Sequence, residues 1–186
     1  HLSNYEISLE MIRALVENLV KQGLARVSVT GGEPFLYPHL NDFFKLLDQN
    51  NIESKINTNG THLNYEIIND LITLGLSEID VSINKLIDDS QTYFDNRDHS
   101  SSRIRSLEML VKHFKGKLVI TASSVLTKHV TNNLFDIERN LADIGVDRWR
   151  LRELMPSQMN NSQAPDEVFP IPAVLVERMV GFVNSE

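Results

Sequence analysis

Apolar residues recur along the chain at two spacings, and the two spacings alternate. Short runs rich in Val, Ile and Thr are typical of strands buried in a parallel sheet. They predict strands over 27–30, 55–58, 79–83, 118–123 and 148–151. Apolar residues three and four positions apart are typical of one face of a helix. They predict helices around 12–19, 40–47, 67–74, 104–114, 134–144 and 175–183.

Capping and turn residues stand at the ends of these elements. Ser3 and Glu6 have the spacing of a capping box, which predicts the start of the first helix. Asn64 is suited to cap the third helix, and Gly145 to end the helix before the last strand. The segment 156–172 is polar and contains prolines, which predicts an irregular connection before a last helix.

Strand and helix patterns alternate five times, which predicts an α/β fold with a parallel sheet and right-handed crossovers. A closed barrel, a partial barrel and an open doubly wound sheet share this alternation, so the spacing alone leaves the three open. The 186 residues are enough for one domain with a sizeable core.

Composition narrows the possible functions. The formal net charge of −7 argues against a general grip on nucleic-acid phosphates. We find no apolar run long enough to span a bilayer and no signal peptide, so we expect a cytoplasmic protein without a membrane partner. The chain contains no cysteine, which excludes a disulfide, a thiolate metal site and a cysteine nucleophile within it.

Small, polar and charged residues gather where the predicted strands end. The first strand is followed by Gly31-Gly32-Glu33-Pro34, and the later ones by 57–60, 82–84, 123–124 and 150–153. Because parallel strands place ligands at their carboxyl ends, these residues predict a site for a polar ligand with amine and carboxylate groups. The chain lacks the glycine-rich dinucleotide fingerprint and the phosphate-binding loop. Ser82 and Ser123 lack His and Asp partners at a recognisable spacing, which argues against a nucleophilic triad.

The order of these motifs resembles the core of the radical S-adenosylmethionine (SAM) superfamily over nearly the whole chain. The resemblance rests on Gly-Gly-Glu-Pro, on Thr58-Asn59-Gly60 and on a strand that ends at Ser82. Within the superfamily, 82–86, 125–128 and 150–156 resemble the GTP 3′,8-cyclase branch of molybdenum-cofactor biosynthesis.

The resemblance implies a partial parallel (β/α) TIM-like barrel over residues 1–186, with SAM and a 4Fe-4S cluster as cofactors. It assigns no catalytic residue and no metal ligand in this chain. The residues that it implies for SAM are Gly31, Gly32, Glu33, Pro34, Thr58, Asn59, Ser82, Arg97, Ser123, Leu154 and Met155. Those that it implies for the substrate are Lys128 and Arg150.

The chain departs from the family pattern in two places. The three cluster-binding cysteines and the first barrel strand are expected before residue 1, so we expect the chain alone to be inactive. Phe35 and its neighbours stand where the cyclase pattern has basic residues, which argues against GTP as the substrate. Arg150 and Arg152 lie on one predicted strand, and we predict that they face opposite sides of the sheet.

The function predicted by the resemblance is reductive cleavage of SAM to a 5′-deoxyadenosyl radical, which abstracts hydrogen from a substrate. The alternatives are the GTP cyclase itself, a peptide-modifying maturase, and a barrel that binds SAM or a nucleotide without catalysis. The expected partners are a small-molecule or peptide substrate and an electron donor such as flavodoxin or ferredoxin.

Overall fold

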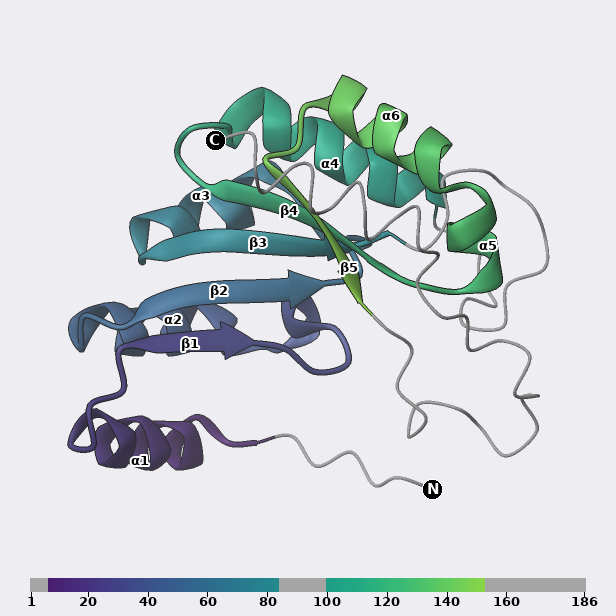
Figure 1. Ribbon diagram of the computed structural model, residues 1–186. Helices are drawn as coiled ribbons and strands as arrows, with labels where there is room; N and C mark the ends of the chain where they lie inside the picture. Colours follow the sequence, from purple (N-terminus) through teal and green to yellow (C-terminus); the bar gives the residue numbers. More distant parts are fainter. Residues whose placement is uncertain (1–6, 84–99, 153–186) are drawn as a thin grey trace.

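The computed structural model describes residues 7–83 and 100–152 (Figure 1). Several predictions lie outside these residues. They concern the Ser3–Glu6 capping box, Arg97, Leu154, Met155, the connection 156–172 and the helix after it.

Five parallel strands form one sheet in the order in which they follow each other along the chain. They are β1 (Arg26–Val29), β2 (Glu53–Thr58), β3 (Leu76–Ser82), β4 (Val119–Val125) and β5 (Arg148–Arg152). All five predicted strands are confirmed. A doubly wound sheet reverses its strand order at one point, whereas this sheet winds in one direction, as a barrel does. The partial barrel is therefore the alternative that fits.

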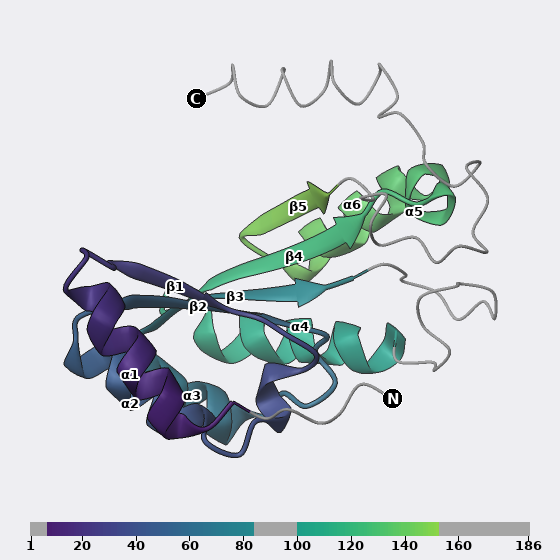
Figure 2. The same ribbon diagram turned by 90° about the horizontal axis from the view of Figure 1, so that it is seen from below.

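Helices cover one face of the sheet, as the view in Figure 2 shows for α1 to α4. The helical segments are α1 (Leu9–Val20), the short 3-10 helix η1 (Pro34–Leu36), α2 (Leu40–Gln49), α3 (Tyr65–Thr73), α4 (Ser100–Phe114), α5 (Lys128–Asn132) and α6 (Leu134–Ile144). The sequence pattern had not predicted η1 or α5. α1 begins at Leu9, and the hydroxyl of Ser8 caps it by accepting the N–H of Met11.

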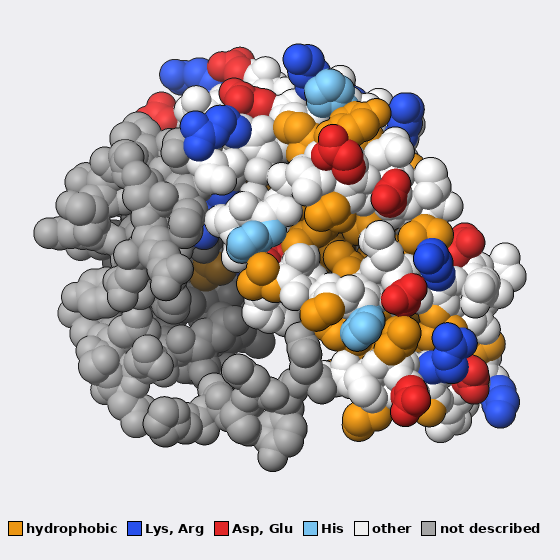
Figure 3. Space-filling view, turned by 180° about the vertical axis from the view of Figure 1, so that it is seen from behind, with side chains coloured by type: hydrophobic (Ala, Val, Ile, Leu, Met, Phe, Trp, Pro, Cys, Tyr) orange, Lys and Arg blue, Asp and Glu red, His pale blue; other side chains and the backbone are white. Residues whose placement is uncertain are grey.

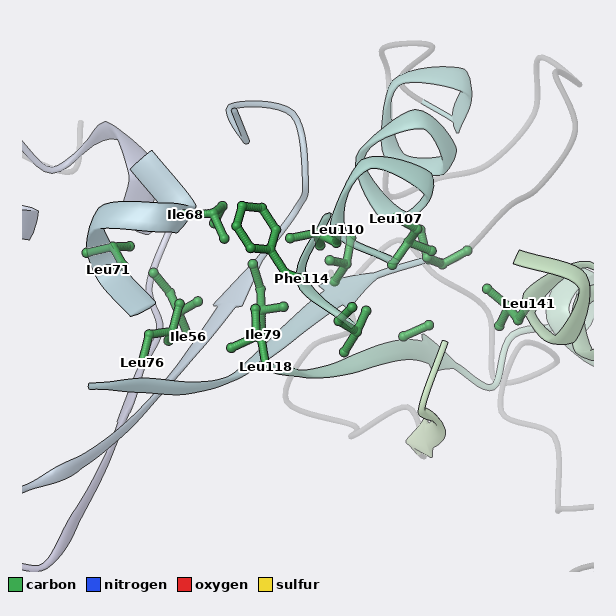
Figure 4. Packing of buried hydrophobic residues seen from close by; sticks show 14 of the residues in the cluster. Ile56, Ile68, Leu71, Leu76, Ile79, Leu107, Leu110, Phe114, Leu118 and Leu141 are labelled. Atoms are coloured by element: carbon green, nitrogen blue, oxygen red, sulfur yellow. The ribbon is translucent and has the colours of Figure 1, made fainter. Parts of the chain in front are cut away.

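The main core lies between the sheet and these helices (Figure 4). Ile56, Ile79 and Ile120 are fully buried on the helix-facing side of β2, β3 and β4. Phe114 from α4 and Ile68 from α3 pack against them. Each fully buried side chain of this size contributes roughly 1.5–3 kcal/mol relative to its exposed state. This packing fixes which residues of each strand face away from the helices.

A second, smaller core lies between α1 and α2. Val16 of α1 is buried together with Leu46, Leu47 and Ile52. Among the described residues, no helix is long and apolar enough to cross a membrane.

Candidate functional site at the carboxyl edge and the inner face of the sheet

Glu33 ties together the loops that follow β1 and β2. Its Oε1 accepts the backbone N–H of Phe35 at 3.2 Å and the hydroxyl of Thr58 at 2.8 Å. Its Oε2 accepts the backbone N–H of Asn59 at 2.8 Å. Both carboxylate oxygens are therefore engaged in bonds to the protein, and the side chain of Glu33 is part of the scaffold of this edge.

Thr58 continues the same network. Its side chain is buried, and its hydroxyl, which donates to Glu33, accepts the backbone N–H of Gly60 at 3.0 Å. Gly60 has a φ of +78°, and a Cβ there would lie 2.9 Å from Cγ1 of Val81. Only glycine combines that φ with so close an approach at low cost. Because the hydroxyl of Thr58 donates to Glu33 and accepts from Gly60, a ligand can use only its remaining lone pair.

The two glycines after β1 are open to a ligand. Among the described residues, no atom would lie within 4 Å of a Cβ at Gly31 or at Gly32, and Gly31 has a φ of +155°. Pro34 is buried and opens η1, which fixes the loop on its far side. The loop is thus held by Glu33 and Pro34, while the backbone of the glycines faces open space.

Two serines continue this edge on the neighbouring strands. Ser82 at the end of β3 is the register partner of Ser123 on β4. The hydroxyl of Ser123 donates to Asp80. No hydrogen bond of the Ser82 hydroxyl occurs within residues 7–83 and 100–152, so this donor remains for a ligand.

The structure brings most of the predicted site residues to one edge of the sheet. They are Gly31, Gly32, Glu33, Pro34, Thr58, Asn59, Ser82 and Ser123. Lys128 is the first residue of α5, and Arg150 lies in the middle of β5.

A cluster of charged side chains occupies the sheet face that points away from the core, which we call the inner face. The members of this charged cluster are Lys55, Glu78, Asp80, Arg148, Arg150 and Arg152. Most of these residues had no predicted role. The signal was present on two strands, because the cluster residues of β3 and those of β5 stand two apart, the spacing that places side chains on one sheet face.

Asp80 is the buried centre of the cluster, with 1% of its side chain exposed. Its Oδ2 accepts from Nη1 of Arg150 at 2.6 Å and from Nη2 of Arg152 at 2.9 Å. Nζ of Lys55 lies 3.4 Å from the same oxygen. Arg150 and Arg152 therefore share one face of β5, and the prediction that they face opposite sides is wrong. Residues two apart on a strand point in the same direction.

Glu78 is the second carboxylate of the cluster. Its Oε1 accepts from Nζ of Lys55 at 2.6 Å, from Thr121 at 3.1 Å and from Nη2 of Arg150 at 3.3 Å. Burial alone would raise the pKa of Glu78, but the hydrogen bond and charge of Lys55, with smaller effects of Thr121 and Arg150, outweigh it and lower the pKa. Nη1 of Arg148 lies 3.4 Å from Oε2. Four cations thus surround two carboxylates.

Comparison with known sequences identifies the family. A model of the radical SAM superfamily matches residues 2–136. An S-adenosylmethionine-dependent nucleotide dehydratase of Flammeovirga pacifica is 26% identical over 165 residues, which cover 86% of this chain and 54% of that protein. A GTP 3′,8-cyclase of Helicobacter pylori is 25% identical over 129 residues, covering 68% of this chain and 39% of that protein. The chain therefore spans about half the length of these relatives, or less.

Solved structures share the fold. The structure of anSMEcpe with bound AdoMet has a TM-score of 0.76 at 16% identity, covering 97% of this chain and 53% of that one. Streptococcus suis SuiB has a TM-score of 0.71 at 13% identity, covering 97% of this chain and 41% of that one. These likenesses confirm the predicted partial TIM-like barrel. The family match covers residues 2–136, which is well over half of this chain, and the chain therefore belongs to the radical SAM superfamily.

Proposed function

We propose that this chain is the SAM-binding core of a radical SAM enzyme, with the methionyl part of SAM seated on the loop after β1. The observation that supports this most is the latch formed by Glu33, Thr58 and Asn59. It holds the loop rigid while the backbone of Gly31 and Gly32 stays open at the carboxyl edge of the sheet. Ligands bind at this edge in parallel α/β sheets.

The residues of this edge fit the polar groups of SAM. Backbone carbonyls beside Gly31 and Gly32 would accept N–H bonds from the ammonium group, because no side chain blocks their approach. The hydroxyl of Ser82 would donate to the carboxylate or to a ribose oxygen. In this proposal Glu33 orients the loop and does not contact SAM through its side chain, since both of its oxygens are engaged.

The 4Fe-4S cluster does not fit the residues of this chain. The sequence contains no cysteine, and the part of the chain that the structure describes has no group of three His, Asp or Glu side chains that could hold a metal. We therefore place the cluster ligands outside these 186 residues. Held by ligands outside these residues, such a cluster would supply the electron for reductive cleavage of SAM.

The substrate would lie over the inner face, beside the SAM edge. We favour a small molecule over a peptide, because both curated relatives are named for nucleotide chemistry. The GTP cyclase remains the second candidate through its cyclase-named relative, although Phe35 and Leu36 follow Pro34 where that branch has basic residues. We also propose a cytoplasmic enzyme that is reduced by a donor such as flavodoxin or ferredoxin.

The first test is SAM binding by this chain, measured by calorimetry. We expect saturable binding that weakens in Ser82→Ala, because the variant removes a free donor at the edge. Ser77→Ala is the matched control, since Ser77 lies at the opposite end of the same strand. Absence of binding by the folded chain, or an equal effect of both variants, would contradict the proposed site.

The second test is chemistry by the full-length protein, purified without oxygen and reconstituted with iron and sulfide. We expect a bound cluster and formation of 5′-deoxyadenosine after addition of SAM and a strong reductant. SAM binding with an intact cluster but without deoxyadenosine would leave a barrel that binds SAM without catalysis.

A further inference from the structure

The inner face holds a local excess of positive charge in an acidic chain. The formal net charge of the chain is −7, yet the charged cluster sets four cations against the carboxylates of Glu78 and Asp80. On the helix-covered side, which Figure 3 shows, basic, acidic and hydrophobic side chains are interspersed. The excess therefore belongs to the inner face in particular, and an anionic group is what it would attract.

Asp80 fixes two guanidinium groups without covering them. The carboxylate of Asp80 is 1% exposed, whereas the side chains of Arg150 and Arg152 are 37% and 48% exposed. Arg150 donates one N–H to Asp80 and one to Glu78, and Arg152 donates one N–H to Asp80. Each guanidinium carries five N–H donors in a planar fork, and within residues 7–83 and 100–152 most of them are left for a ligand. The two forks are thus held in place from below by a buried acid.

We propose that Arg150 and Arg152, oriented by Asp80, form a clamp for a phosphate group of the substrate. This assignment deepens the proposed function and rests on it, because the phosphate belongs to the molecule on which the radical enzyme acts. Two guanidinium forks match the several oxygens and the double charge of a phosphate better than they match one carboxylate. The charge excess of the cluster also equals the charge of one phosphate dianion.

The register of the sheet sets the clamp beside the SAM edge. Arg150 is the register partner of Ser123, and Ser123 is the partner of Ser82. Neighbouring strands lie about 4.8 Å apart, so roughly 10 Å separates Arg150 from Ser82 across the sheet. A substrate held by its phosphate at β5 would extend over β4 and β3 toward the predicted SAM position.

The test is a calorimetric titration of the chain with inorganic tripolyphosphate at fixed ionic strength. We expect saturable binding that weakens at least about 10-fold in Arg152→Gln, because a charge-assisted bond is lost. The affinity of Arg152→Lys should lie between those of the wild type and Arg152→Gln, since lysine keeps the charge and lacks the planar fork. The matched control is Arg26→Gln, which removes the same charge from an exposed pair with Glu53 on the same sheet. We expect it to bind as the wild type does.

Three results would overturn the clamp: no saturable binding by the folded wild type, an equal loss in Arg26→Gln, or equally tight binding of citrate. The last would show that any polyanion suffices. A nucleoside triphosphate and glucose 6-phosphate, titrated in parallel, distinguish nucleotide from other phosphate sources. Circular dichroism of each variant separates lost binding from lost folding. Since the titration needs neither SAM nor the iron–sulfur cluster, its failure is distinguishable from failure of SAM binding.

Discussion

The carboxylate of Glu33 accepts the backbone N–H of Asn59 at 2.8 Å, although the two residues are 26 positions apart in the sequence. The bond joins the loop after β1 to the loop after β2. It explains why Gly-Gly-Glu-Pro and Thr-Asn-Gly occur together in one chain, since the acid of the first motif is satisfied by the second. One oxygen serves Asn59, and the other serves Phe35 and Thr58.

Replacing Glu33 by Gln should damage both stability and SAM binding. The amide keeps one acceptor and turns two N–H groups toward donors that the carboxylate had satisfied. We expect the free energy of unfolding to fall by roughly 1–3 kcal/mol and SAM to bind more weakly. Denaturant unfolding and calorimetry measure the two effects. Glu108→Gln on the exposed side of α4 is the control, and equal effects of the two variants would refute the latch.

The hydroxyl of Thr58 can be tested without changing the shape of the side chain. Thr58→Val removes the bridge between Glu33 and the N–H of Gly60, and it leaves that buried N–H without its partner. We expect a loss of roughly 1–3 kcal/mol in the free energy of unfolding. Thr58→Ser keeps the hydroxyl and should regain most of it. A serine variant as unstable as the valine variant would show that packing of the methyl group is what matters.

Gly60 should tolerate a methyl group far less well than Gly23. Both have positive φ, at +78° and +91°, so Ala is strained at either position. At Gly60 the new Cβ would also lie 2.9 Å from Val81, while at Gly23 it would meet nothing within 4 Å. We expect Gly60→Ala to cost about 1–3 kcal/mol more than Gly23→Ala in thermal unfolding. If the double variant Gly60→Ala/Val81→Ala loses less stability than the two single variants lose in sum, the clash lies between the new Cβ and the side chain of Val81.

The sequence predicted the strands well because their chemistry is local. Runs such as Val27-Ser28-Val29 and the ends at Gly31 and Ser82 mark where each strand lies and stops. The strand order depends on how helices such as α3 and α4 cross between strands, and the spacing of apolar residues carries no record of it. The resemblance to the radical SAM superfamily implied the consecutive strand order of a barrel, and the folded chain confirms it.

The charged cluster was missed for a different reason. The predicted site residues are those that end each strand, whereas Glu78 and Asp80 lie within β3 and Arg148 begins β5. A charged residue within a strand is visible in the sequence, but its partners come from strands that lie 23 to 72 positions away along the chain. The shared face of Arg150 and Arg152 could have been predicted from the period of two along any strand.

Glu78 should make the stability of the protein sensitive to acid. Its pKa in the folded state lies below the reference value of 4.5, so its contribution is present above that pH. The contribution is lost as the pH falls through the lower, folded-state pKa. We therefore expect the wild type to exceed Glu78→Gln in unfolding free energy at pH 7, and the difference to shrink toward pH 3.

Lys55→Gln provides the control for this pH dependence. It removes the cation that does most to lower the pKa of Glu78. Like Glu78→Gln, it should therefore lose less unfolding free energy than the wild type between pH 7 and pH 3. Denaturant unfolding of the three proteins at several pH values measures the effect. A difference between wild type and Glu78→Gln that stays constant from pH 7 to pH 3 would show that the Glu78 charge does not contribute.

Asp80→Asn should be among the most destabilising changes in the sheet that preserve side-chain shape. Three cations approach this buried carboxylate, and without its charge they repel one another. We expect a loss of about 1–3 kcal/mol, because the bonds from the partly exposed side chains of Arg150 and Arg152 lose their charge assistance. Asp70→Asn on the exposed side of α3 is the control.

A double variant tests whether the lost stability comes from unbalanced cations. In that case Arg152→Gln in the Asp80→Asn background should restore part of the stability. A fully additive loss would show that Asp80 and Arg152 are not coupled.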